Sequence, residues 1–373
     1  RLRPGARQPL AAERLGADDR PDLVAVDVDV ADPHRAHDLV DPVVDARVEA
    51  EGEPVALAVD RLDHLADRLG EPYGTLVLTL SVISIEVALI AAIMLTGDSS
   101  PTLARDTMFA ILMIVLNGFI GAALLIGALI YREQDYNLQG ARSYLSVLVP
   151  LSVFSLLLPA FTTTTASPTF SPGQAVFFAV ITALLYLVFL AMQTGRHRGY
   201  FADHNDTDDH GRITDETAPP ADRRGIIVHA ALLVLTLLPI ILLSKFMAKV
   251  IDFGIVRAGA PIALGGIVIA LIVLAPEGIA ALQAARANHL QRSVNLLLGA
   301  ALSTIGLTVP AVLVLGLVTG QTVVLGLDQV FMVILLLTLV LCSFTFGGVR
   351  TNLLQGAVHL VIFLAYMVLV FSP

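Results

Sequence analysis

The chain has 373 residues, of which 56% are hydrophobic and only 15% charged, and its mean hydropathy is +0.79. This composition excludes an ordinary soluble domain and predicts an all-α polytopic membrane protein. The formal net charge of −9 lies mostly near the N-terminus, so the apolar part is nearly neutral and no nucleic-acid surface is expected. The single cysteine, Cys342, excludes an intrachain disulfide.

Residues 1–70 differ in composition from the rest of the chain. They hold 16 acidic residues and 9 arginines, and they lack Ser, Thr, Asn, Lys, Ile, Phe, Met, Tyr, Trp and Cys. Two interpretations of residues 1–61 stay open: a disordered acidic tail, or a segment read from a wrong frame or start in a GC-rich gene. We favour the second, because the composition changes abruptly at about residues 62–73.

Apolar runs separated by polar breaks predict nine membrane-spanning helices from residue 75 onward. One long polar linker divides them into four and five, which predicts a first repeat over 62–193, an acidic loop over 194–225 and a second repeat over 226–373. The predicted spans are 75–96, 107–130, 143–160, 173–193, 226–246, 260–285, 294–318, 328–347 and 353–371.

The five arginines of the linker place it in the cytoplasm by the positive-inside rule. Alternation then puts loops 131–142 and 286–293 inside and loops 161–172 and 319–327 outside, although Lys245, Lys249 and Arg257 fall outside and oppose this scheme. The span that carries Glu86 and the span that carries Glu277 run in opposite directions. Such antiparallel halves are typical of inverted-repeat transporters with a site at the bilayer midplane.

Glu86 and Glu277 lie inside otherwise apolar runs, 76–95 and 261–290. A carboxylate at membrane depth is costly, so ordinary spans avoid one. One such residue can be a protonated glutamate paired with a neighbouring helix, but a pair, one in each half, indicates a cation or proton site. We expect both to act as metal ligands.

Pro276 and Gly278 flank Glu277 in the segment LAPEG. Proline removes a backbone donor and glycine relaxes the helix, so these residues predict a helix break that frees carbonyl oxygens at the site. Such oxygens suit hard cations such as Ca²⁺ and Na⁺.

Uncharged polar residues in mid-span are further candidates. The oxygens of Asn117, Ser303 and Thr304 could complete a coordination shell, and Thr308 lies in the same run; interhelical packing is an equal alternative. His359, near the inner end of the last span, is either a proton relay or, more commonly for such a residue, a buried histidine with satisfied hydrogen bonds.

The acidic loop resembles the start of a calcium-binding loop at Asp206–Gly211, but its twelfth position is Thr217 rather than glutamate. A solvated linker is the default interpretation of residues 203–216. The sequence contains no Gly-rich phosphate loop and no catalytic triad or zinc-spaced cluster in its spans. It therefore predicts neither an enzyme nor a bound cofactor.

Five segments resemble the bacterial calcium/proton antiporters, also described as sodium (potassium)/proton antiporters, of the calcium:cation antiporter superfamily. They are HLADRLGEPYGTLVLTLSVISIEVALI, PTLARDTMFAILMIVLNG, TFSPGQAVFFAVI, LAPEGIAALQAARANHLQRSVNLLLGAALSTIGLTVP and GGVRTNLLQGAVHLVIFLAY, and they lie in this order within residues 62–373. The resemblance implies two inverted five-helix repeats around one site, with an acid on the second helix of each, here Glu86 and Glu277.

Two features depart from the family pattern. The superfamily often has Gly-Asn before the acid, whereas this chain has Ser-Ile before Glu86 and Ala-Pro before Glu277, so the ion preference is left open. Residues 1–60 lack the apolar spans that the family has there, so the first repeat is expected to be short of one helix.

These observations predict a multi-pass protein of the bacterial inner (plasma) membrane, whose partners are the lipid bilayer, inorganic cations and protons. We expect it to exchange cytoplasmic Ca²⁺, Na⁺ or K⁺ for external protons by alternating access at the glutamate pair. The alternative is a cation channel or leak pathway in which the glutamates form a constriction. The inverted repeats favour antiport.

Overall fold

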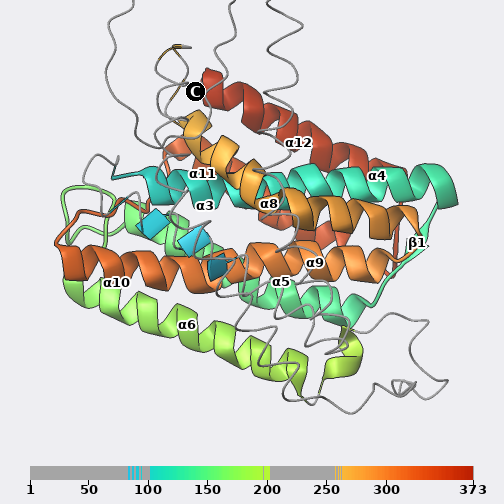
Figure 1. Cartoon of the computed structure of the whole chain (residues 1–373), viewed down its shortest axis with the longest axis horizontal. Helices are drawn as coiled ribbons and strands as arrows, with labels where there is room; N and C mark the ends of the chain where they lie inside the picture. The colour runs from blue at the N-terminus through green and yellow to red at the C-terminus, as the bar shows by residue number, and fades with distance from the viewer. Residues whose placement is uncertain are drawn as a thin grey trace, which may run out of the picture. The chain divides into compact units, whose positions relative to one another are not determined.

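The computed structural model describes residues 101–195, 197–201 and 263–372, and it also describes Ile83, Ser84, Glu86, Val87, Ile90, Ala91, Met94, Arg257, Gly259 and Pro261. The predictions for residues 1–61, for the acidic loop 203–216 and for the span 226–246 lie outside the described residues. The described part is almost entirely helical (Figure 1).

The helices before the linker follow one another with short connections. In chain order they are α3 (Leu103–Met113), η1 (Ile114–Phe119), α4 (Ile120–Tyr131), α5 (Leu138–Ser152), η2 (Val153–Leu157), η3 (Leu158–Ala160), α6 (Pro172–Thr194) and η4 (Arg198–Tyr200). The segments η1 and η2 are π-helical, and each continues the α-helix before it.

The helices after the linker repeat this plan. They are α8 (Ala263–Arg286), α9 (Leu290–Ser303), η6 (Thr304–Thr308), α10 (Val309–Thr319), α11 (Gln329–Thr345) and α12 (Leu353–Phe371), and η6 is again π-helical. Two short strands, β1 (Gln134–Asp135) and β2 (Arg350–Thr351), pair antiparallel and link the two halves.

The membrane prediction is confirmed for the described residues. Six helices there are long and apolar enough to cross a bilayer, and the 17-residue α11 is a shorter apolar helix. Predicted spans 107–130 and 294–318 begin earlier, at Leu103 and Leu290, because polar residues at their starts are accommodated within the helices. The predicted span 75–96 is represented by helical residues between Ile83 and Met94.

Equivalent helices of the two halves make equivalent contacts. α4 packs on α12, and α10 packs on α6, so the second part of each interrupted helix meets the last helix of the other half (Figure 1). In the same way α11 contacts η1 and α5 contacts η6. This exchange of partners is what two inverted repeats produce.

The loops predicted to be cytoplasmic meet at one end of the bundle. Arg350 of β2 forms ion pairs with Glu133 at 3.2 Å and with Asp135 at 2.9 Å. The hydroxyl of Tyr131 donates to the backbone oxygen of Arg286. Loops 131–142 and 286–293 therefore lie on the same side, as the charge pattern predicts; we call this side the inner end.

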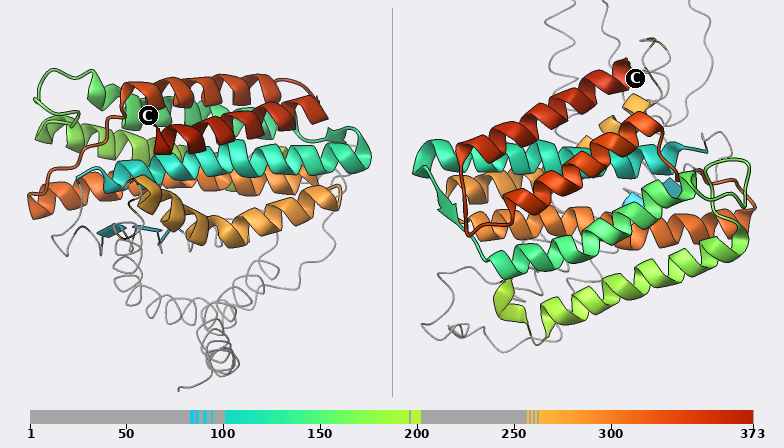
Figure 2. Two further views of the ribbon diagram at one scale, coloured as in Figure 1. Left: turned by 90° about the horizontal axis from the view of Figure 1, so that it is seen from above. Right: turned by 180° about the vertical axis from the view of Figure 1, so that it is seen from behind.

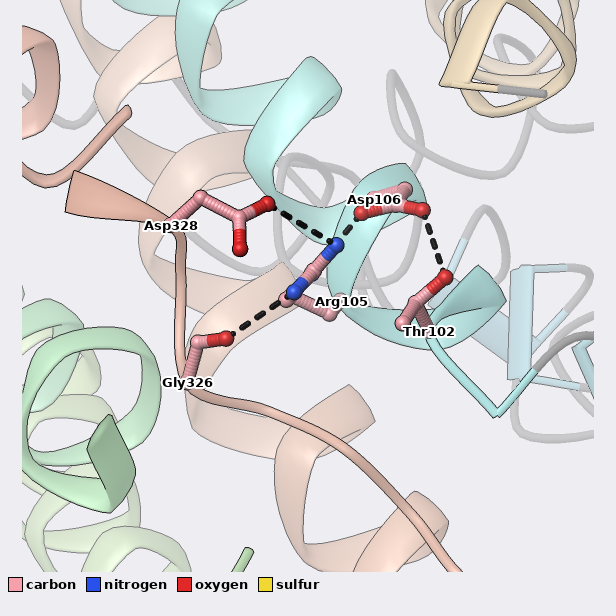
Figure 3. Close-up of polar contacts among 5 residues, drawn as sticks. All are labelled: Thr102, Arg105, Asp106, Gly326 and Asp328. Atoms are coloured by element: carbon pink, nitrogen blue, oxygen red, sulfur yellow. Dashed lines mark hydrogen bonds and ion pairs between the residues drawn. The ribbon is translucent and has the colours of Figure 1, made fainter. Parts of the chain in front are cut away.

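The loops predicted to be external meet at the other end, around a buried arginine at the start of α3 (Figure 3). Arg105 Nε lies 2.8 Å from Asp106 Oδ1, and its Nη1 donates to the backbone oxygen of Gly326 at 3.0 Å. Its Nη2 lies 3.6 Å from Asp328 Oδ2, and Thr102 donates to Asp106 at 2.9 Å. These contacts hold the α10–α11 connection against α3 at the outer end.

Burial follows the arrangement expected in a bilayer. α3 and η1 are almost wholly buried at the centre, whereas α6 and α12 expose large apolar side chains along one face. Figure 2 shows α6 and α12 on the outside of the bundle. Because lipid solvates apolar side chains, such exposure is normal in a membrane-spanning protein.

Candidate cation-binding site

Glu86 is 2% exposed and contacts the second half of the molecule directly. Thr304, the first residue of η6, donates its hydroxyl hydrogen to Glu86 Oε2 at 3.0 Å. Thr308, at the end of η6, lies beside the same carboxylate, yet its hydroxyl makes no hydrogen bond of normal geometry among the described residues. The π-helical segment of the second repeat thus faces the acidic residue of the first.

Glu277 lies in α8, is 3% exposed and interacts electrostatically with Glu86. The helices that carry the two glutamates run in opposite directions. The Glu86 helix extends to Met94, whose backbone oxygen accepts from Gln321 at the outer end, and α8 ends at Arg286 at the inner end. The structure therefore brings the predicted pair together in the antiparallel arrangement that the topology predicts.

The prediction that the helix breaks at Pro276 and Gly278 is wrong. α8 is a single helix from Ala263 to Arg286 that passes through Pro276, and Figure 2 shows it bent rather than interrupted. The neighbouring turns on either side supply enough hydrogen bonds to keep the helix intact where proline lacks its donor. Gly278 has a packing role: a Cβ there would lie 2.3 Å from the ring of Phe119.

The interruptions occur instead in the helices that face the glutamates. η1 and η6 lie in the middle of the long spans Leu103–Tyr131 and Leu290–Thr319. A π-helical turn widens the helix by one residue and disturbs the regular backbone hydrogen bonds, which is why such turns are frequent at functional sites. Asn117 lies in η1, and Thr304 and Thr308 lie in η6.

Asn117 is fully buried, and both ends of its carboxamide have partners. Nδ2 donates to Thr338 Oγ1 at 2.8 Å, and Oδ1 lies 3.2 Å from His359 Nδ1. Its oxygen, which was expected to bind a cation, is thus occupied by a histidine in this conformation. Ser303 is also buried and donates to the backbone oxygen of Ala300 at 3.0 Å, a bond internal to α9.

Several buried oxygen atoms near the pair are available to a cation. Glu86 Oε1, Glu277 Oε2 and Thr308 Oγ1 are buried with no hydrogen-bond partner among the described residues. Ser152 in α5, a helix that contacts η6, and Ser155 in the following segment η2 also have hydroxyls without a partner among the described residues. Buried polar atoms are normally paired, so this set fits a hard cation that binds carboxylate and hydroxyl oxygens.

Sequence reasoning missed Ser152, Ser155 and Thr338. Each is a small polar residue in a largely apolar span, a pattern that also occurs wherever helices pack closely. The two serines are three apart and follow Pro150 within the same helix, which was the signal available. No group of three or more His, Cys, Asp or Glu occurs among the described residues, so the donor set does not resemble a transition-metal site.

Comparison with known proteins agrees with this geometry. The chain matches the family described as "Sodium/calcium exchanger protein" over residues 55–195 and 228–372. It belongs to that family. The two matched segments lie on either side of the acidic loop and include both Glu86 and Glu277.

Two relatives are similar over most of their length. One is the "Sodium-potassium/proton antiporter ChaA" of Escherichia coli (strain K12), 40% identical over 320 residues that cover 84% of each chain. The other is the "Putative ionic transporter y4hA" of Sinorhizobium fredii (strain NBRC 101917 / NGR234), 41% identical over 323 residues that cover 86% of each chain.

The fold is also similar to a solved structure. The "H+/Ca2+ Exchanger CAX" superposes with a TM-score of 0.58 at 17% identity, covering 83% of this chain and 79% of the other. The predicted fold, a polytopic bundle of two inverted repeats, is thereby confirmed. The family consists of exchangers, so this chain is a cation antiporter of the membrane rather than an enzyme, as predicted.

Proposed function

We propose that this antiporter exchanges cytoplasmic cations for external protons at the Glu86–Glu277 pair. The observation that carries the proposal is that two buried, interacting carboxylates on antiparallel helices each keep one oxygen without a hydrogen-bond partner among the described residues. Protons or a cation can neutralise such a pair, but both cannot occupy it at once. Competition for one site is sufficient to couple the two fluxes.

Alternating access supplies the movement. The pair lies between the halves of an inverted repeat, so rocking of one half against the other opens the site to each side in turn. With protons bound from outside and a cation bound from inside, the proton gradient drives cation export. Ca²⁺, Na⁺ and K⁺ are the candidate cations, in line with the names of the family and of the Escherichia coli relative.

Thr304 and Thr308 are proposed to complete the cation site from η6. Thr304 already donates a hydrogen bond to Glu86, and Thr308 lies beside the same carboxylate with a hydroxyl that makes no hydrogen bond of normal geometry among the described residues. Hydroxyl oxygens add ligands to the site without adding negative charge, which allows monovalent as well as divalent ions to bind. Asn117 contributes through its position in η1, and Ser303 contributes packing.

The test is proton flux in everted membrane vesicles that contain the full chain. Adding Ca²⁺, Na⁺ or K⁺ to vesicles with an acidic lumen should make the lumen alkaline, and the response to each ion ranks the ions. Glu86→Gln or Glu277→Gln should abolish the response while the protein still inserts. A matched control is Glu133→Gln, the same change at an exposed glutamate of the inner end, which should retain exchange.

Two results would contradict the proposal. Exchange that survives in a Glu86 or Glu277 variant removes that residue from the mechanism. Cation entry with no proton response favours the channel alternative, in which the glutamates form a constriction.

A further inference from the structure

His359 is a buried titratable residue that the proposed mechanism does not use. It lies in α12, has no exposed surface and has a partner at each ring nitrogen. Nδ1 lies 3.2 Å from Asn117 Oδ1, and Nε2 lies 2.9 Å from Thr345 Oγ1. The backbone of Leu116, the neighbour of Asn117 in η1, also lies beside the ring.

The partners define the direction of the hydrogen bonds. A carboxamide oxygen can only accept, so Nδ1 carries the hydrogen and donates to Asn117. In the neutral ring Nε2 then accepts from the hydroxyl of Thr345. The hydrogen bonds continue in the same direction beyond Asn117. Its Nδ2 donates to Thr338, whose hydroxyl donates to the backbone oxygen of Ile334 at 2.8 Å.

Close packing of two helices holds the histidine in place. A Cβ on Gly121 of α4 would lie 3.0 Å from His359 Cβ, and a Cβ on Gly356 of α12 would lie 2.7 Å from the backbone nitrogen of Leu125. The backbones of α4 and α12 can approach this closely only because both positions are glycine. His359 therefore reaches across to η1 from a fixed position.

η1 in turn packs against the helix that carries Glu277. A Cβ on Gly278, the residue after Glu277, would collide with the ring of Phe119 in η1. A change in the conformation of η1 therefore alters the packing next to Glu277.

From this network we infer that His359 is a positioning residue of the exchanger. By donating to Asn117 it fixes the carboxamide and the π-helical segment η1 that borders the cation site. The inference rests on the proposed cation site and adds to it a residue that contacts no predicted ligand other than Asn117. Groups in this position, which orient ligands without touching the ion, typically change metal affinity when they are replaced.

Two substitutions separate the two hydrogen bonds. Asparagine places an N–H donor where Nδ1 was, so H359N keeps the bond to Asn117 and loses the bond to Thr345. Glutamine places its amide group near Nε2, so H359Q keeps a partner for Thr345 and loses the bond to Asn117. In the vesicle assay H359Q should raise the cation KM by about 10- to 100-fold with little change in maximal rate, whereas H359N should stay near the wild type.

Controls distinguish positioning from general stability. Thr345→Val, which removes only the outer bond, should leave the KM near that of the wild type. In an Asn117→Ala background, H359Q should raise the KM no further, because the group through which His359 acts is gone. Equal loss in H359N and H359Q, or an additive effect of H359Q with Asn117→Ala, would overturn the inference.

A spectroscopic test does not depend on transport. In ¹⁵N NMR of the purified full chain, the signal that disappears in H359N should be that of a ring protonated at Nδ1, and it should shift in Asn117→Ala. A ring protonated only at Nε2 would overturn the inference even if exchange is normal. Absence of exchange by the wild type, with the Nδ1–H signal present, would instead contradict the proposed function alone.

Discussion

The π-helical segments η1 and η6 interrupt equivalent helices of the two repeats, yet their polar side chains are satisfied differently. In η1, Asn117 bonds to Thr338 and His359, so its carboxamide is fully engaged by the protein. In η6, Thr304 bonds directly to Glu86, and the hydroxyl of Thr308 has no hydrogen-bond partner in the part of the chain that the structure describes. The polar side chain of η1 is thus hydrogen-bonded to groups outside the glutamate pair, whereas η6 contacts Glu86 directly.

This difference indicates that inverted repeats need not contribute equally to a shared site. The repeats supply the same backbone geometry, whereas the side chains decide which segment meets the ion. We therefore expect substitutions in η6 to act on cation affinity directly and equivalent substitutions in η1 to act through packing or through His359.

The largest difference is expected at Thr304. Thr304→Val removes the hydrogen bond to Glu86 and leaves both carboxylate oxygens without a partner. The cation KM should rise by about 10- to 100-fold in the vesicle assay, and Thr304→Ser should restore it because the hydroxyl returns. An unchanged KM in Thr304→Val would show that the side chains of η6 act on the cation no more directly than those of η1.

The next difference is in packing at the glycines of the two segments. A Cβ on Gly306 of η6 would lie 2.8 Å from the ring of Tyr186, whereas a Cβ on Gly118 of η1 would meet Phe363 at an ordinary 3.5 Å. Gly306→Ala should therefore destabilise the protein by about 1–3 kcal/mol through overpacking. Gly118→Ala should stay within about 0.5 kcal/mol.

Thermal unfolding in detergent measures this pair. The expected result is a clearly lower Tm for Gly306→Ala and a nearly unchanged Tm for Gly118→Ala. The reverse order would mean that the last helix of the first repeat, α6, packs less closely on η6 than the structure indicates.

The smallest effect is expected at Thr308, compared with Ser303 five residues earlier. Thr308→Val removes a buried hydroxyl that has no hydrogen-bond partner among the described residues, so stability should be unchanged or slightly higher. Its loss as a ligand should raise the cation KM by about 3- to 10-fold, the cost of about one hydrogen-bond-strength interaction. Ser303→Ala should leave the KM unchanged, because that hydroxyl is bonded to the backbone of α9. Equal effects of the two substitutions on the KM would place Ser303 in the site after all.

Much of the membrane architecture could be predicted from the sequence. Runs of apolar residues identify spans because the bilayer core accepts little else, and the arginines of the inner loops predicted which loops meet at one end. Glu86 and Glu277 stood out because a carboxylate is rare at that depth. Their electrostatic interaction fits the expectation of one shared site between two antiparallel halves.

The form of the interruptions could not be predicted in the same way. Pro276 indicated a break in α8, but the helix continues. The π-helical segments that hold Asn117 and Thr304 contain no proline themselves, although Pro310 follows η6 by two residues. A π-helical turn has no strong residue preference and arises where tertiary contacts compensate for the disturbed hydrogen bonds. The role of Ser303 stays a prediction for a related reason, because a serine in a helix can also bond its own backbone, as this one does at Ala300.

The sequence by itself determined that this protein is a bundle of membrane-spanning helices in two halves with one buried acid in each, because hydropathy and charge act locally and are read from composition. Only the tertiary structure decided which oxygens those acids meet. Thr304 bonds Glu86 across 218 positions of the chain, and His359 takes the oxygen of Asn117 across 242. Such pairings depend on how closely the helices pack, which is set by glycines and by the shapes of the facing side chains together.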